Sequence, residues 1–125
     1  MGLITTPAAT SVIGCALRVH TNLGPGLLES VYADCLAQEL KKDRLEFQRQ
    51  VRLPLKYEGG LLRRVFVADF VVEDSVLVEL KSIDRILSVH CAQVLTYLRL
   101  AGLRKGLLIN FNTAHLRDGI RSFVR

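Results

Sequence analysis

The spacing of hydrophobic positions in the first third of the chain predicts two helices. Helical periodicity extends over Ser11–His20, with Thr10 or Ser11 as the N-cap, and again over Leu27–Lys42. The Gly, Pro and Asn residues of segment 21–26 indicate a turn between these helices.

The remainder of the chain combines strand and helix patterns. Strands are expected at Phe47–Tyr57, Leu62–Val72 and Val76–Lys81, with turns at Glu58–Gly60 and Glu73–Ser75. A helix is then expected at Ser88–Ala101, followed by an apolar central strand at Lys105–Phe111 and a short tail. Because a strand–helix–strand link implies a parallel crossover, the pattern predicts an α/β domain with a mixed central sheet flanked by helices.

Three charged residues lie on two adjacent, otherwise apolar strands of this prediction. Alternation places Glu79 and Lys81 on one face of their strand, and the polar turn before it brings Asp69 beside Glu79. Ionised groups in apolar surroundings are costly unless they are paired or bound to a metal. Two carboxylates and an ammonium group therefore indicate a divalent-cation site with a lysine beside it.

The alternative for these charges is a solvated sheet face with a cross-strand salt bridge. That arrangement would also expose the neighbours on the same face, Val67, Val71 and Leu77. The metal site is therefore the preferred interpretation.

A further carboxylate, Glu29, lies near the start of the second predicted helix. It is in phase with Tyr32 and Leu36, and so falls on the apolar stripe of that helix. Stabilisation by the helix dipole would also explain an acid in the first turn. Both a functional and a purely structural role are therefore open for Glu29.

The helix expected at Ser88–Ala101 carries a polar pair, Gln93 and Tyr97, which share a face because they are four residues apart. The pair could form the rim of an amphipathic helix or part of a cleft. His20 and His90 form no His-x-x-x-His motif, which disfavours zinc. No nucleophilic-hydrolase or dinucleotide motif is present.

Composition limits the class of protein. The 125 residues predict one domain over 1–125, with residues 1–10 as an N-terminal extension, and the 50% hydrophobic content argues against disorder. No apolar run approaches the roughly 18 residues of a membrane span, and no secretion signal is recognisable. Three widely separated cysteines are expected to be reduced, in a cytoplasmic protein. The net charge of +5 suits a polyanionic partner.

Several segments together resemble a known family. Leu23–Tyr32 resembles the Gly-x-x-Glu-x-x-Tyr signature of the GxxExxY protein family, and its later blocks resemble Val78–Ser82, His90–Gln93, Thr96–Leu98 and Gly106–Phe111, in the same order. The resemblance covers about residues 11–124. Since that family is assigned to the PD-(D/E)XK nuclease-like superfamily, it implies a restriction-endonuclease-like α-β-β-β-α-β core. Ala68 replaces the proline of the superfamily motif, which is a common variation.

The resemblance also implies roles for individual residues. Asp69 corresponds to the metal-binding acid, Glu79 to the second acid and Lys81 to the lysine of the motif. Glu29 falls where many members carry a helix-borne acid. The element Gln93-x-x-x-Tyr97 is similar to one of the exonuclease branch related to the RecB nuclease domain.

The implied function is a Mg²⁺- or Mn²⁺-dependent nuclease that hydrolyses phosphodiester bonds of DNA. The expected catalytic residues are Asp69, Glu79, Lys81 and Glu29, of which the three acids would hold the metal. Gln93 and Tyr97 would position the substrate strand. Phosphate contacts are expected from Arg18, Arg63, Arg64 and Arg85.

Two alternatives remain from the sequence. The first is a catalytically silent, nuclease-like module that binds nucleic acid or a partner protein. The second is an interaction module, for example a homodimer, whose buried charges pair internally. No membrane partner is expected in either case.

Overall fold

The computed structural model describes residues 6–125, and the side chains of these residues except 63–65. The elements in chain order are α1 (Pro7–Leu23), α2 (Glu29–Lys42), β1 (Phe47–Tyr57), β2 (Gly60–Val72), β3 (Val76–Lys81), α3 (Ser88–Ala101), β4 (Lys105–Asn110), the 3₁₀ helix η1 (Leu116–Gly119) and β5 (Ile120–Val124). The bounds predicted for β1, β3 and α3 are confirmed.

A five-stranded mixed sheet in the order β1-β2-β3-β4-β5 forms the centre of the molecule. β1 with β2, β2 with β3, and β4 with β5 are antiparallel pairs. β3 and β4 are parallel and are connected through α3. The predicted α/β class and mixed sheet are confirmed.

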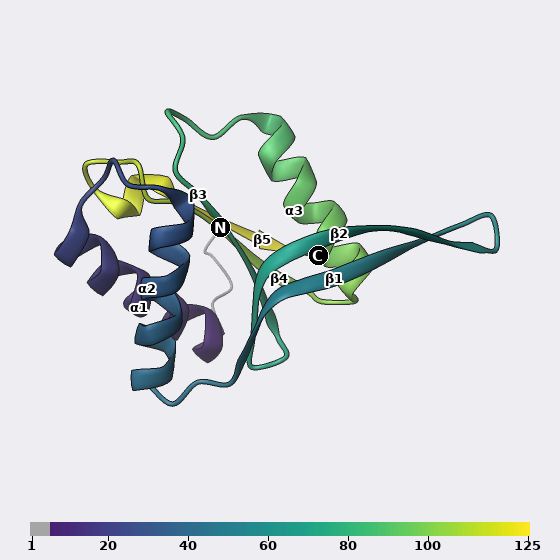
Figure 1. The fold of residues 1–125 in the computed structure, drawn as a ribbon, viewed down its shortest axis with the longest axis horizontal. Coiled ribbons are helices and arrows are strands. Elements are labelled where there is room, and N and C mark those ends of the chain that lie inside the picture. The colour runs from purple at the N-terminus through teal and green to yellow at the C-terminus, as the bar shows by residue number, and fades with distance from the viewer. Residues whose placement is uncertain (1–5) are drawn as a thin grey trace.

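Helices cover both faces of the sheet (Figure 1). α1 and α2 pack on one face, where buried residues such as Val12, Leu36 and Val78 form the larger core cluster. α3 packs on the other face, where Leu77 and Leu98 belong to a smaller cluster. No helix of residues 6–125 is long and apolar enough to cross a membrane.

The first helix begins earlier than the sequence pattern predicted. Its N-cap is Thr6, whose Oγ1 accepts a hydrogen bond from the Ala9 N–H at 3.1 Å, so the prediction of an N-cap at Thr10 or Ser11 is wrong. Pro7 occupies the first helical position, where its fixed φ suits a helix and its missing N–H leaves no bond unmade. Residues 7–10 of the expected N-terminal extension are therefore helical.

Other boundaries also differ from the prediction. α1 ends at Leu23 rather than His20, β2 begins at Gly60 rather than Leu62, and β4 ends at Asn110 rather than Phe111. The second helix begins at Glu29 rather than Leu27, because the residues before it form a hydrogen-bonded turn. The expected tail is instead η1 and the strand β5, which pairs with β4. A buried strand such as β4 needs partners on both sides for its backbone groups. The five residues of β5 are too few to give a clear periodic signal of this role.

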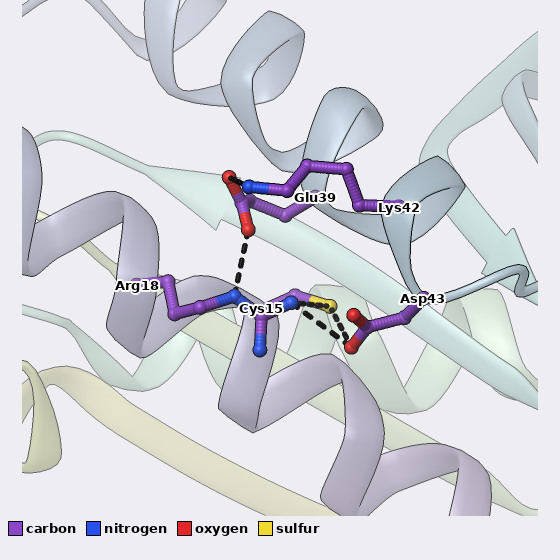
Figure 2. A network of polar contacts seen from close by, with 5 residues as sticks. All are labelled: Cys15, Arg18, Glu39, Lys42 and Asp43. Atoms are coloured by element: carbon purple, nitrogen blue, oxygen red, sulfur yellow. Dashed lines mark hydrogen bonds and ion pairs between the residues drawn. The ribbon is translucent and has the colours of Figure 1, made fainter.

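A polar network joins α1 to the end of α2 (Figure 2). Arg18 binds Glu39 at 2.7 Å and Asp43 at 2.9 Å, and the Cys15 thiol donates to Asp43 at 3.3 Å. Burial, followed by the hydrogen bond to Asp43, raises the pKa of Cys15 to about 11. Because two carboxylates hold its guanidinium, we assign Arg18 to this interhelical contact rather than to a phosphate.

Candidate active site

Asp69 and Glu79 meet where the ladder between β2 and β3 ends. The last pairs of this ladder are Val71 with Leu77 and Phe70 with Val78, and the two acids occupy the next positions. At these positions, each carboxylate accepts a hydrogen bond from a backbone N–H of the opposite strand, in place of a backbone carbonyl. Glu79 Oε1 accepts from the Asp69 N–H at 2.9 Å, and Asp69 Oδ2 accepts from the Leu80 N–H at 2.8 Å. The carboxylates therefore lie beside each other at a fork between the strands.

The neighbouring strand β1 is also irregular at this level. Its register with β2 passes from Arg49–Phe70 to Val51–Ala68 and leaves out Gln50, whose φ is 52°. Phe70 belongs to the core on the α1–α2 side, whereas Ala68 belongs to the core beneath α3. The β1–β2 pair therefore rotates at the position of the candidate site.

Burial and mutual repulsion disfavour the ionised forms of the two acids. Glu79 is only 5% exposed, and desolvation followed by the charge of Asp69 raises its pKa to about 8. Desolvation also raises the pKa of Asp69, against the opposing effects of the Leu80 N–H and Lys81. These two carboxylates would therefore gain from a bound cation, because it would compensate charges that the protein alone does not neutralise.

Lys81 provides a positive charge next to this pair. It lies two residues beyond Glu79 on β3, and its charge lowers the pKa of both Asp69 and Glu79. None of the ion pairs found among the described residues involves Lys81. Its ammonium group therefore acts on the acids through space and is not held by one of them.

The apolar neighbours decide against a solvated sheet face. Val71 is 7% exposed and Leu77 is fully buried, whereas Val67 is exposed. Two of the three neighbours that a solvated face would expose are therefore in the core. The acids lie at the border of the core, and a simple surface salt bridge does not describe them.

Glu29, the first residue of α2, lies toward the same site. As a residue it is exposed, yet desolvation followed by the charge of Asp69 raises the pKa of its carboxyl, and Lys81 lowers it. These effects require the carboxyl to be near both Asp69 and Lys81. Glu29 is thus an exposed acid whose charge couples to the site, and its role there stays a prediction.

The turn before Glu29 is held by hydrogen bonds from the side chains of Tyr32 and Ser82. The Tyr32 hydroxyl donates to the Gly24 carbonyl at 2.5 Å and accepts from the Leu27 N–H at 3.2 Å. The ring of Tyr32 stacks on Phe111 at 4.4 Å. Ser82, just after β3, donates to the Leu27 carbonyl at 2.6 Å. The start of α2 is therefore fixed to the end of β3.

We expect Tyr32→Phe to keep the fold but to lower the free energy of unfolding by about 1–2 kcal/mol, because two hydrogen bonds are lost while the ring stacking remains. Urea denaturation measures this change, and amide hydrogen exchange at Leu27 should become faster. Tyr57→Phe, at a tyrosine that is 63% exposed, is the matched control and should change neither quantity. Equal stability of both variants would show that the hydroxyl does not hold the turn.

The α3 pair predicted from the sequence is formed. Gln93 Nε2 donates to the Tyr97 hydroxyl at 3.2 Å, and Tyr97 is 6% exposed. Desolvation, followed by the charges of Glu79 and Asp69, raises the pKa of Tyr97. The phenol of α3 is therefore near the two acids, and Gln93 lies behind it on the same helix face.

Two residues near the site escaped the sequence reasoning. Arg49 on β1 lies 5.3 Å over the Phe70 ring, binds Asp34 at 3.0 Å and lowers the pKa of Asp69. Asn110, opposite Lys81 in the β3–β4 register, accepts from the Ile83 N–H and donates to the Ile83 carbonyl. A residue-by-residue pairing of β1 with β2 would have indicated that Arg49 lies near Asp69. No sequence pattern indicated a structural role for Asn110.

The histidines and a cavity of about 670 Å³ lie outside this site. His90 Nδ1 accepts from the Leu87 N–H at the start of α3, and His20 Nε2 bonds the Thr113 carbonyl. The cavity lies between the α1–α2 turn and η1, and His20 and Asp118 are among its lining residues. Asp69 and Glu79 do not line it, so we base the functional assignment on the acids and not on this cavity.

The donor set limits what the site could bind. Within residues 6–125, no group of three or more His, Cys, Asp or Glu side chains is close enough to hold a metal ion as it stands. Asp69 and Glu79 each use one carboxylate oxygen for a backbone N–H, and Asp69 Oδ1 and Glu79 Oε2 have no hydrogen-bond partner among the described residues. Two carboxylate oxygens are thus available to a divalent cation. The Glu29 carboxyl is not close enough to form a three-acid group with them.

Comparison with known proteins identifies the family. No curated protein and no solved structure matches the chain. The family model described as the PD-(D/E)XK nuclease superfamily matches residues 7–123, which includes every element from α1 to β5 except its last residue. With nearly the whole chain matched and a mixed sheet flanked by helices, the protein belongs to the PD-(D/E)XK nuclease superfamily.

Proposed function

We propose that this protein is a divalent-metal-dependent nuclease that hydrolyses phosphodiester bonds of DNA. The observation that supports this most is the reciprocal pair at the strand fork, in which Asp69 and Glu79 each bond the backbone of the opposite strand. This pair lies beside Lys81, inside a family of nucleases. A surface ion pair would have no need of two adjacent acids at the border of the core, one of them buried.

In the proposed mechanism, the residues of the site have different roles in phosphodiester hydrolysis. Asp69 and Glu79 would hold Mg²⁺ or Mn²⁺, together with the Leu80 carbonyl. Lys81 would stabilise the negative charge that develops on the phosphoryl oxygens, or orient the attacking water. Glu29 would complete the acidic set from the α2 side when substrate and ion are bound.

Tyr97 and Gln93 would contact the substrate from α3. The Tyr97 hydroxyl is near the acids and is hydrogen-bonded to Gln93, which fixes the orientation of its ring edge. A hydroxyl and an amide at this place can bond a phosphate or sugar oxygen of the strand to be cut. We assign them to positioning because neither group is matched to the transfer of a proton at neutral pH.

The donor set is compatible with Mg²⁺ or Mn²⁺. Mg²⁺ is commonly held by one or two carboxylates while water and substrate phosphate supply its other ligands, so two available carboxylate oxygens are enough. When bound, the ion would supply an activated water molecule and charge neutralisation at the phosphate. The raised pKa of Glu79 means that binding must displace a proton, and affinity for the ion should therefore increase with pH toward about 8.

A catalytically silent module that binds nucleic acid is the second candidate. It is favoured by one observation, the lack of any three-residue metal cluster within the described part of the chain. In this alternative the three acids would repel phosphate, and only the surrounding cations would attract it. Cleavage itself is therefore the property that separates the two functions.

The test is cleavage of labelled single-stranded, duplex and branched DNA, and of RNA, by the purified protein with Mg²⁺ or Mn²⁺. We expect DNA fragments to appear with metal and not with EDTA. Calorimetry with Mn²⁺ in parallel measures binding of the ion. Binding of Mn²⁺ without cleavage of any substrate would favour the silent module, and failure to bind Mn²⁺ at all would exclude the metal site.

A further inference from the structure

The hairpin formed by β1 and β2 extends beyond the rest of the molecule. It projects past α3 as a two-stranded ribbon (Figure 1), and its strand β2 continues into the segment that carries Asp69. We call residues 51–67 the arm. At its base, Leu53 belongs to the core beneath α3, and the Phe66 ring lies 5.9 Å from that of Tyr97. The arm is therefore anchored to the helix that carries the substrate-positioning pair.

The arm holds much of the positive charge of the protein. It contains Arg52, Lys56, Arg63 and Arg64 but only one acid, Glu58, a net charge of +3 in a chain whose total is +5. The register with β1 passes from Leu55–Leu62 to Pro54–Val65, so the backbone of the two consecutive arginines forms a bulge in β2. This concentration of positive charge on an exposed ribbon suits a polyanionic partner.

The cations described on β1 share one face of the arm. Leu53 and Phe66 are a register pair on the α3 side, so the alternate residues Arg52 and Lys56 point away from α3. Both are exposed, and the ion pairs found among the described residues do not involve either of them. These two cations are thus available to a polyanion.

The tip of the arm is apolar and exposed. Tyr57 is 63% exposed and Leu61 60% exposed, and Leu61 is the register partner of Lys56. Arms that combine cations along their length with apolar residues at the end can contact phosphates and, at the same time, the sugars or bases in a groove. A two-stranded ribbon also has the width that the major groove of B-DNA admits.

We propose that the arm lies along duplex DNA and holds it for the candidate active site. This inference rests on the proposed function and adds to it the form of the substrate and the element that grips it. Val51 pairs with Ala68, the neighbour of Asp69, and Lys56 lies five residues farther out. At about 3.4 Å per strand residue, Lys56 reaches roughly 17 Å from the acids, which is about half a turn of B-DNA.

The experiment measures binding of a labelled DNA duplex by fluorescence anisotropy in EDTA, where cleavage is absent, over a range of salt concentrations. The arm variant is Arg52→Gln with Lys56→Gln. The control is Lys41→Gln with Arg104→Gln, which removes the same charge from exposed positions outside the arm. Urea denaturation of each variant verifies that it is folded.

We expect the arm variant to bind roughly tenfold more weakly, and the slope of log K against log salt to fall in magnitude by about 2, because each lost phosphate contact removes close to one unit. The control should retain the affinity and slope of the unchanged protein. Equal losses in both variants, no loss in the arm variant, or no duplex binding by the unchanged protein would each overturn the proposal.

A second copy of the chain is the competing occupant of the arm. If Leu61→Ser dissociates a dimer in sedimentation while DNA affinity stays unchanged in the arm variant, the arm is a dimer contact and the proposal is wrong. Cleavage by the unchanged protein and by Glu79→Gln is recorded in parallel. If the arm variant loses DNA binding but the unchanged protein cleaves no DNA, the arm proposal stands and the nuclease proposal is wrong. If the unchanged protein cleaves DNA but the arm variant binds DNA normally, the nuclease proposal stands and the arm proposal is wrong.

Discussion

Glu79→Gln, Asp69→Asn and Lys81→Ala are each expected to reduce DNA cleavage by at least about 10²–10³-fold while the protein remains folded. Each acid variant keeps an amide oxygen that can accept the same backbone N–H, so the fork between β2 and β3 can persist. Each removes a charge that the proposed mechanism needs. The loss of one group that stabilises the transition state typically costs about 2.7–4 kcal/mol.

Metal binding should separate the roles within this set. The two acid variants should also lose Mn²⁺ affinity in calorimetry, whereas Lys81→Ala should retain it, because an ammonium group is not a metal ligand. Glu46→Gln and Lys41→Ala, at exposed positions away from the fork, are the matched controls and should cleave normally. Comparable turnover by the unchanged protein and by Glu79→Gln would indicate a contaminating nuclease or a different site.

The same Glu79→Gln substitution is expected to stabilise the metal-free protein at high pH. The folded state raises the pKa of Glu79 from 4.5 to about 8, so between these values the folded protein binds more protons than the unfolded chain. The stabilising effect of this uptake is complete below about pH 4.5 and is lost as the pH rises through about 8. Gln has no charge to desolvate and is not repelled by Asp69.

The advantage of Gln over Glu should therefore be near zero at pH 4.5 and should grow to the order of a few kcal/mol at pH 9. Urea denaturation at several pH values in EDTA measures it. Saturating Mn²⁺ should reverse the order, since it stabilises only the protein that binds it. A difference that is independent of pH would contradict the assignment, and Glu46→Gln should give a flat profile.

The two expectations have one physical origin. A pair of adjacent carboxylates at the border of the core opposes folding at neutral pH when no cation is present. Sites that bind substrates or ions commonly retain such unfavourable arrangements because the bound state compensates them. Stability and activity should therefore respond in opposite directions to Glu79→Gln.

Much of the fold could be predicted from the sequence because it depends on local patterns of hydrophobic and polar residues. Period-two alternation gave the bounds of Phe47–Tyr57, and the apolar segment after the polar turn gave those of Val76–Lys81. Helical periodicity gave Ser88–Ala101. The short polar turn brought Asp69 opposite Glu79, since a tight hairpin allows few registers. Spacing along a single element likewise placed Gln93 with Tyr97.

Other features depended on partners distant in sequence. β5 is a strand because it pairs with the edge of β4, and its five residues, although they include Ile, Phe and Val, are too few to show a clear period. Arg49 approaches Asp69 only through the β1–β2 register, and Asn110 holds the segment after Lys81 from a neighbouring strand. Such contacts are set by which backbones meet, and local periodicity does not encode that.

The sequence by itself determined the residue types of the candidate site and the strands that carry them. Only the tertiary structure decided that the strands separate at Asp69 and Glu79, because the side chains replace the ladder bonds there. It also brought the first turn of α2 to the acids, through the Tyr32 hydroxyl and Ser82. Alternation specifies the face of a side chain, whereas its depth, its charge environment and its neighbours depend on packing between elements.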